Sequence, residues 1–123
     1  MKIKKFNIAM YNWKITFVEI TSKKDIKKVD KILSKFKVKK ESRKTVKENI
    51  RDKCVNGGNC FWNNDYHKTL IFLYPSTSKK TRQQILSHEK RHCEDSLLEH
   101  LNIKDFESAA CLSGFLGKKL FKK

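Results

Sequence analysis

The segment from Lys79 to His100 has the signature of one long helix, and it constrains how the rest of the chain can fold. Pro75 ends any strand before it, and residues 76–78, Ser-Thr-Ser, supply candidates for the helix N-cap. Asn102 provides a stop, because asparagine tolerates the left-handed backbone that closes many helices. The apolar contacts expected of this helix are Ile85, Leu86, Cys93, Leu97 and Leu101.

The N-terminal half predicts a strand followed by helices. Residues 13–20 alternate as a strand does, because successive side chains of a strand point to opposite faces of its sheet. Residues 25–36 keep a 3.6-residue apolar period, which predicts an amphipathic helix packed on that sheet. Residues 37–53 fit either a short strand beginning at Val38 or another helix running to the Gly57-Gly58 break. The residues expected on one face of the strand are Trp13, Ile15 and Phe17.

The C-terminal half supplies a hairpin and a last helix. Residues 59–74 predict the hairpin, and Asp105 can cap a helix from Phe106 to Leu116 that closes at Gly117. We therefore predict one α+β domain, with a short, mostly antiparallel sheet packed on helices and the long helix at its centre. Its parts are a basic strand-helix half (1–55), a half with the hairpin and two helices (56–117) and a basic tail (118–123).

Residues 88–92 read His-Glu-Lys-Arg-His, an H-E-x-x-H motif inside the long helix. Residues four apart on a helix share one face, about 6 Å apart along the axis, so His88 and His92 can offer two imidazole nitrogens to one ion. Zinc takes such ligands, and a catalytic zinc keeps one position open for water. Glu89 is placed to act on that water. The alternative is two ordinary surface histidines that pair with Glu89 or Asp95 and bind no metal.

A catalytic zinc needs a third protein ligand, and three residues after the motif are candidates. His100 lies two helical turns beyond His92, about 12 Å along the axis, which is too far for the same ion. Asp95 also recedes along the axis, so an orienting role for His92 suits it better. Glu107 can come from outside, because a turn at residues 102–104 lets the next helix fold back. The predicted metal ligands are His88, His92 and Glu107.

The H-E-x-x-H motif followed by Glu107-Ser-Ala-Ala110 resembles the gluzincin branch of the zincin metallopeptidases. Within that branch, residues 57–117 are similar to minimal domains of the ImmA/IrrE type. The resemblance implies one zinc ion, Glu107 as its third ligand and Glu89 as the general base on zinc-bound water. It also implies that the edge strand before the motif helix, within residues 60–74, holds an extended peptide by main-chain pairing.

A peptidase also needs a hydrogen-bond donor for the oxyanion. Tyr66, His67 and Tyr74 lie along the segment expected to contact substrate, and Arg91 lies within the motif. The alternative for the first three is packing in the hairpin or core. For Arg91 the alternative is a surface ion pair or a supporting contact, with Asp95 as its partner four residues on.

The formal charge of +16 is concentrated in the first part of the chain. Residues 1–55 hold 18 basic and 6 acidic side chains, against 11 and 7 in residues 56–123. Because 25 of the 29 basic residues are lysine, a solvated lysine face is the favoured interpretation. The alternative is a surface within residues 23–53 that contacts an acidic protein or nucleic acid.

The leading hypothesis is a small zinc metalloendopeptidase that cleaves a specific protein substrate. Its alternative is a non-catalytic binding or structural module with the zincin fold, which attaches to nucleic acid or to a virus particle through the lysine-rich half. Polar residues interrupt the apolar residues of the first 17 positions, so neither a signal peptide nor a membrane span is expected. We expect a cytoplasmic protein.

Overall fold

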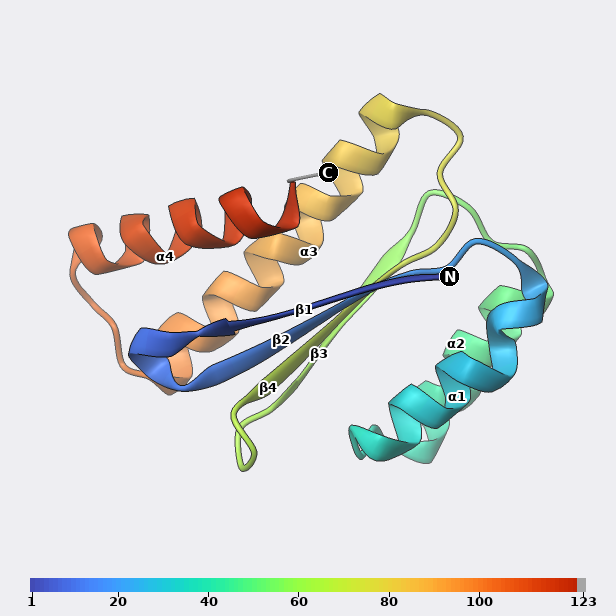
Figure 1. Cartoon of the computed structure of the whole chain (residues 1–123), viewed down its shortest axis with the longest axis horizontal. Helices are drawn as coiled ribbons and strands as arrows, with labels where there is room; N and C mark the ends of the chain where they lie inside the picture. Colours follow the sequence, from blue (N-terminus) through green and yellow to red (C-terminus); the bar gives the residue numbers. More distant parts are fainter. Residues whose placement is uncertain (122–123) are drawn as a thin grey trace.

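A computed structural model gives the structure of residues 1–121, which form four helices and a four-stranded sheet in three layers (Figure 1). Helices α1 and α2 cover one face of the sheet, and α3 and α4 cover the other. The predicted α+β class is confirmed, while Lys122 and Lys123 of the predicted tail lie outside the described residues. The elements are β1 (Lys2–Ile8), β2 (Trp13–Glu19), α1 (Ile26–Lys35), α2 (Lys40–Arg51), β3 (Gly58–Asn63), β4 (Lys68–Leu73), α3 (Lys79–His100) and α4 (Phe106–Leu120).

The sheet has the strand order β1-β2-β4-β3 and is mixed. Its two outer pairs, β1 with β2 and β3 with β4, are antiparallel, as tight connections between consecutive strands allow. The central pair, β2 with β4, is parallel because α1, α2 and β3 lie between them in the chain. Strands β1 and β3 are therefore the two edges of the sheet within the described chain.

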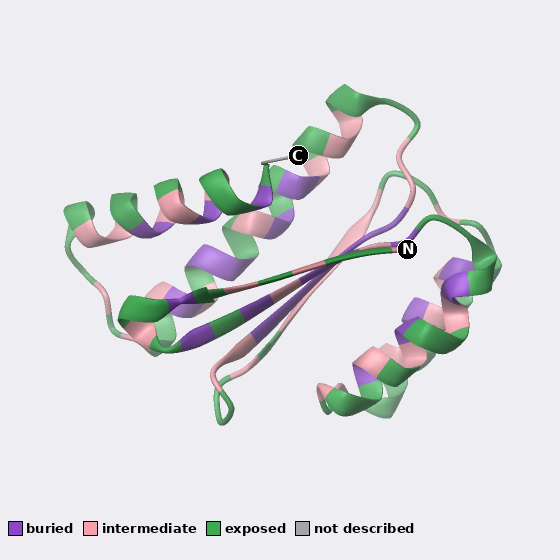
Figure 2. Ribbon diagram, in the orientation of Figure 1, coloured by how far each residue is buried: buried purple, intermediate pink, exposed green. Residues whose placement is uncertain are grey.

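Alternation along β2 divides its side chains between two cores. Trp13, Ile15 and Phe17 are buried together against α3 and α4, which confirms the predicted face. Val18 and Ile20 point the other way and pack with α1 and α2. Figure 2 shows the buried positions of all four helices on the sides that face the sheet. The Trp13 indole also donates to the hydroxyl of Thr69 on β4 over 2.8 Å, so its one polar group is satisfied in the core.

The motif helix α3 spans Lys79–His100, as predicted. The side chain of Ser78 accepts a hydrogen bond from the backbone N–H of Thr81, which satisfies one open donor of the first turn. Asn102 adopts φ 55 just after the helix, the left-handed conformation expected of its stop. Local capping chemistry therefore sets both ends of the segment that carries the motif.

Helix α4 begins as predicted but runs further. The Asp105 side chain accepts from the backbone N–H of Ser108 over 2.8 Å. The predicted end at Gly117 is wrong, because the helix continues to Leu120. Leu116 and Leu120 are both buried in the core, and this packing outweighs the penalty of about 1 kcal/mol for glycine in a helix.

Residues 37–53 contain a helix, and the alternative strand at Val38 is wrong. Lys37 has φ 64 and ends α1. Helix α2 then buries Val46 and Ile50 against the same face of the sheet as Val29 and Leu33 of α1. The lysines of both helices stay in solvent, as the amphipathic pattern requires.

Candidate metal centre

Helix α3 brings His88, Glu89 and His92 into one group, with one ligand atom from each within 4.8 Å of the others. The two Nε2 atoms are 3.0 Å apart, and Nε2 of His88 lies 4.0 Å from Oε1 of Glu89. A tetrahedral ion with bonds of about 2.0–2.1 Å to nitrogen separates two such nitrogens by about 3.3 Å. The imidazoles therefore converge almost as one ion needs, and the group could hold a metal ion.

Glu89 differs from His88 and His92 in its burial. Its side chain is 6% exposed, whereas that of His88 is 68% exposed. Burial raises the pKa of Glu89 above its ordinary value, and the positive charge of His92 and His88 acts in the opposite direction. Its Oε2 atom is buried and has no hydrogen-bond partner among the described residues. The carboxylate thus combines a raised pKa with one unsatisfied acceptor beside two accessible imidazoles.

Gly58, the first residue of the edge strand β3, makes room for Glu89. A Cβ atom at this position would lie 2.7 Å from the carbonyl oxygen of Phe72 and 3.0 Å from Cγ of Glu89. The contact with the backbone oxygen is too close for a Cβ atom, and the contact with Glu89 would push that side chain aside, so glycine suits this position. The sequence predicts only a break between elements at Gly57-Gly58. The signal for this contact is a glycine at the start of a strand that packs on the motif helix.

The structure does not bring Glu107 into the group. Glu107 is an exposed residue in the first turn of α4, whereas the His-Glu-His group of the described chain lies wholly on α3. Lys90 points about 200° around the helix from His88, and its ammonium donates to the Ser113 hydroxyl of α4 over 2.9 Å. Helix α4 therefore packs on another side of α3 from the histidines. Helix α4 thus folds back against α3 as expected, but it does not bring Glu107 to the two histidines.

Lys90 holds the two helices together from inside their interface. It forms an ion pair with Glu94, and both side chains are largely buried. Gly117 of α4 lies against the lysine, since a Cβ atom there would be 3.4 Å from Cε of Lys90. Lys90, inside the H-E-x-x-H motif, is thus a packing residue between α3 and α4.

Asp95 and Arg91 bind each other. Nε of Arg91 lies 3.1 Å and 3.4 Å from the two carboxylate oxygens of Asp95, on an exposed part of α3. This is the i,i+4 ion pair considered for them, and no hydrogen bond joins Asp95 to His92 within the described residues. The orienting role predicted for Asp95 is therefore not formed here.

The residues expected along the edge strand take other positions. Strand β4 lies inside the sheet, so only β3 is an edge in the segment from Cys60 to Tyr74. Tyr74 is buried on the side of α1 and α2, where its hydroxyl donates to Asn59 over 2.8 Å. Tyr66 lies in the hairpin turn, and its hydroxyl accepts from the ammonium of Lys37 over 2.9 Å.

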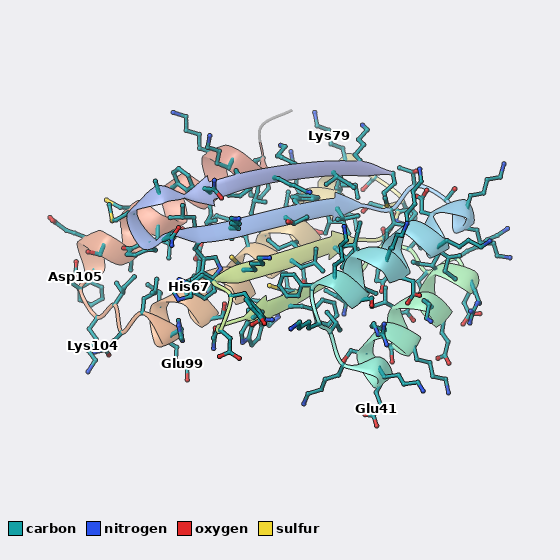
Figure 3. All side chains as sticks on the ribbon, turned by 60° about the horizontal axis from the view of Figure 1, so that its bottom comes forward. Glu41, His67, Lys79, Glu99, Lys104 and Asp105 are labelled. Atoms are coloured by element: carbon teal, nitrogen blue, oxygen red, sulfur yellow. The ribbon has the colours of Figure 1, made fainter. Side chains whose placement is uncertain are left out.

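His67 and His100 form an aromatic cluster with Trp13, apart from the metal group. The ring of His67 stacks on Trp13 with centroids 5.0 Å apart, and His100 meets the same indole edge-on at 5.5 Å. Figure 3 marks His67 at the hairpin end of the sheet. This placement agrees with the prediction that His100 is not a metal ligand. His67 packs in the hairpin, which is the alternative to a role in substrate binding.

Comparison with protein-family models, curated proteins and solved structures finds no match to this chain. Within residues 1–121, no helix combines the length and apolar character needed to cross a bilayer.

Proposed function

We propose that this chain is a small zinc-dependent hydrolase that cleaves a peptide bond in a protein substrate. The observation that carries the proposal is the convergence of the two Nε2 atoms beside a buried carboxylate with an unsatisfied oxygen. A surface pair of histidines has no need of such a carboxylate. Burying a charge without a partner destabilises a fold, and such arrangements concentrate where chemistry uses them.

His88 and His92 would hold the ion through their Nε2 atoms, and zinc is the metal whose preferred ligands they are. When bound, zinc supplies a Lewis acid that lowers the pKa of water to about 7 and polarises a carbonyl group. Glu89 takes a proton from the attacking water and delivers it to the leaving amine.

Glu89 has a second possible role, as a third ligand. Its oxygen belongs to the group within 4.8 Å, and Glu107 lies elsewhere. Two imidazoles leave two positions of a tetrahedral ion for other ligands. The Glu89→Gln variant separates the two roles. If Glu89 is only the base, its replacement leaves zinc affinity almost unchanged; if Glu89 is a ligand, its replacement lowers zinc affinity.

Substrate would reach the site along β3. The outer edge of this strand has no partner strand among residues 1–121, so its main-chain groups are open to an extended peptide. Gly58 places the start of β3 against Glu89. A peptide paired with β3 would then present its backbone next to the catalytic carboxylate, as the gluzincin resemblance also implies.

The test combines metal analysis with peptide cleavage. Purified protein should take up about one equivalent of zinc, and His88→Ala should abolish that uptake. Glu89→Gln should lower turnover by about 10²- to 10⁴-fold, the usual contribution of a general base. Asp95→Asn is the matched control, because this exposed carboxylate on the same helix pairs with Arg91 and should leave both properties unchanged. Native protein that binds no zinc would overturn the proposal.

One observation favours a second function, a non-catalytic binding module. The described chain offers only two histidines and one carboxylate to an ion, and the net charge is +16. In that case the Glu89→Gln variant would equal the wild type in every cleavage assay, while binding to a polyanion would persist.

A further inference from the structure

A groove of about 540 Å³ lies on the sheet face opposite the metal group. Strands β1, β2 and β4 form its floor, and the C-terminal end of α1 forms one wall. Lys68 follows His67, which Figure 3 labels at the end of the sheet away from the N-terminus of α1. Here α1 and α2 do not cover the sheet, so polar side chains of its strands are open to solvent.

Four lysines line this groove, and its lining contains no carboxylate. Lys14 of β2 and Lys68 of β4 are direct cross-strand partners, so their side chains leave the same face side by side. Lys5 joins them from β1, where its partner is Thr16, and Lys35 approaches from α1. Like charges directly opposite in a sheet are destabilising. Among residues 1–121, none of these four lysines has an ion-pair partner that offsets this repulsion.

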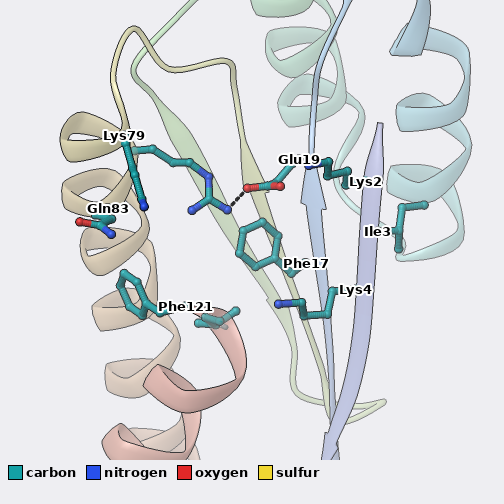
Figure 4. A pocket seen from close by; sticks show the side chains of 10 residues that line it. Lys2, Ile3, Lys4, Phe17, Glu19, Lys79, Gln83 and Phe121 are labelled. Carbon is teal, nitrogen blue, oxygen red and sulfur yellow. Dashed lines mark hydrogen bonds and ion pairs between the residues drawn. The ribbon is translucent and has the colours of Figure 1, made fainter. Parts of the chain in front are cut away.

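A cavity of about 520 Å³ on the other face provides a contrast. It is also basic, with Lys2, Lys79 and Arg82 in its lining. Its arginine, however, is held by an ion pair with Glu19, which Figure 4 shows across the cavity mouth. The carboxylate of Glu19 therefore neutralises part of the positive charge in that cavity. The groove on the opposite face has no such internal anion in its lining.

We propose that this groove binds single-stranded nucleic acid, with Lys5, Lys14, Lys35 and Lys68 on its phosphates. Four cations without an internal anion match a repeated negative charge, and the half-buried side chains of Phe36 and Ile32 in the same lining offer apolar contact to sugars and bases. The lysines come from three strands and a helix, so their spacing is irregular. A flexible single strand can follow this irregular spacing of the lysines. The volume of the groove suits about one or two nucleotide units, whereas a rigid duplex would contact only its rim.

The position of the aromatic side chains supports this partner over an acidic peptide. The ammonium of Lys68 lies 5.9 Å from the ring centroid of Tyr66, and Lys37 lies 4.8 Å from it. Tyr66 is 54% exposed, so an unstacked base can reach its ring. An acidic peptide would use the lysines but has no need of an exposed aromatic ring close to Lys68. The groove is independent of the proposed hydrolase, because it lies on the other side of the sheet from α3.

The test measures binding of fluorescently labelled oligo(dT) to the full chain by anisotropy over a range of salt. Lys5, Lys14, Lys35 and Lys68 are changed together to glutamine. The control changes Lys27, Lys28, Lys31 and Lys44, four exposed helical lysines outside the groove lining, and removes the same charge. We expect the groove variant to bind at least tenfold more weakly. Its plot of log K against log salt should also be shallower, by about 0.7 for each phosphate contact that is lost.

Three results would overturn the proposal. Equal weakening by both quadruple variants would show that net charge alone acts. Competition by poly-glutamate as strong as that by unlabelled oligo(dT) would assign the groove to acidic proteins. Duplex DNA bound more tightly than the single strand would place recognition at the rim.

A stability measurement separates a binding role from a structural one. Lys14→Gln removes one member of the like-charge pair, so its melting temperature should rise while its affinity for oligo(dT) falls. A lysine kept for stability would give a lower melting temperature, which contradicts the proposal. The same measurement shows that the variant is folded.

Discussion

At the scale of single residues, Gly58 and Glu89 depend on each other. The strand beside the buried carboxylate begins with a glycine, and a Cβ atom there would lie 3.0 Å from Cγ of Glu89. Glu89 then keeps an unsatisfied oxygen and a raised pKa, both of which follow from this burial. The H-E-x-x-H motif supplies the carboxylate, and Gly58 leaves room for β3 to pack against it.

Gly58→Ala should destabilise the protein by about 1–3 kcal/mol, the usual cost of overpacking. The added Cβ would meet the backbone oxygen of Phe72 at 2.7 Å, and backbone cannot move aside as a flexible side chain can. Urea unfolding measures the change. Gly114→Ala is the control, because a Cβ there meets nothing within 4 Å and should stabilise α4 by about 0.5–1 kcal/mol. Equal effects of the two substitutions would contradict the packing of Gly58.

Glu89→Gln should raise the stability of the metal-free protein at neutral pH. The pKa of Glu89 is raised by folding, so its ionised form disfavours the folded state. That cost is absent below the unfolded pKa, appears as pH rises towards the folded pKa, and is constant above it. Melting curves from pH 3 to pH 8 should therefore show a gain for the variant that vanishes in acid. A gain that is independent of pH would exclude ionisation as its cause.

At the scale of elements, α3 serves three purposes on different sides. It presents His88 and His92 to solvent, buries Leu86, Cys93 and Leu97 in the core, and binds α4 through Lys90. A helix can do this because each residue turns by about 100°, so neighbours in sequence face different surroundings. The metal group therefore depends on how firmly α3 is formed and held.

Ser78→Ala should cost about 1 kcal/mol by removing the N-cap of α3. The motif lies ten residues further on, so zinc uptake should be unchanged when the protein is folded. Thermal unfolding measures the loss, and Ser87→Ala, at an exposed position inside the same helix, is the control. A loss as large in the control would show that capping is not the cause.

At the scale of the whole molecule, one sheet separates two surfaces with different chemistry. Helix α3 carries the metal group on one side, and the lysine groove opens on the other. The two edge strands, β1 and β3, also differ in their surroundings, because the first residue of β3, Gly58, packs against Glu89 of the motif. A net charge of +16 on a fold of this size means that repulsion is felt across the entire molecule.

Adding salt should raise the melting temperature. The Debye length falls from about 30 Å at 0.01 M to about 8 Å at 0.15 M, so repulsion among the lysines is screened over this range. Calorimetry in sodium chloride measures the rise. The variant with glutamine at Lys5, Lys14, Lys35 and Lys68 should show a smaller one, since four of the positive charges are gone. A melting temperature that falls with salt would show that attractive ion pairs dominate instead.

The amino-acid sequence by itself determined most of the elements and the spacing of the motif. The caps and the apolar period of the helix at residues 79–100 can be read from residues within or next to that segment. The strand from Trp13 and the hairpin are likewise predicted from alternation and turn residues in their own segments. The pairing of His88 with His92 also needed only the pitch of a helix. These features rest on interactions between residues close together in the chain, which a sequence displays directly.

The tertiary structure alone decided which distant residues meet. Helix α4 packs beside Lys90 and leaves Glu107 away from the histidines, and β4 enters the sheet so that Tyr74 is buried rather than at an edge. Lys14 and Lys68 become neighbours only through the parallel pairing of β2 with β4. Strand order and the side on which a helix packs depend on the fit of whole surfaces, and no local period or cap records that fit.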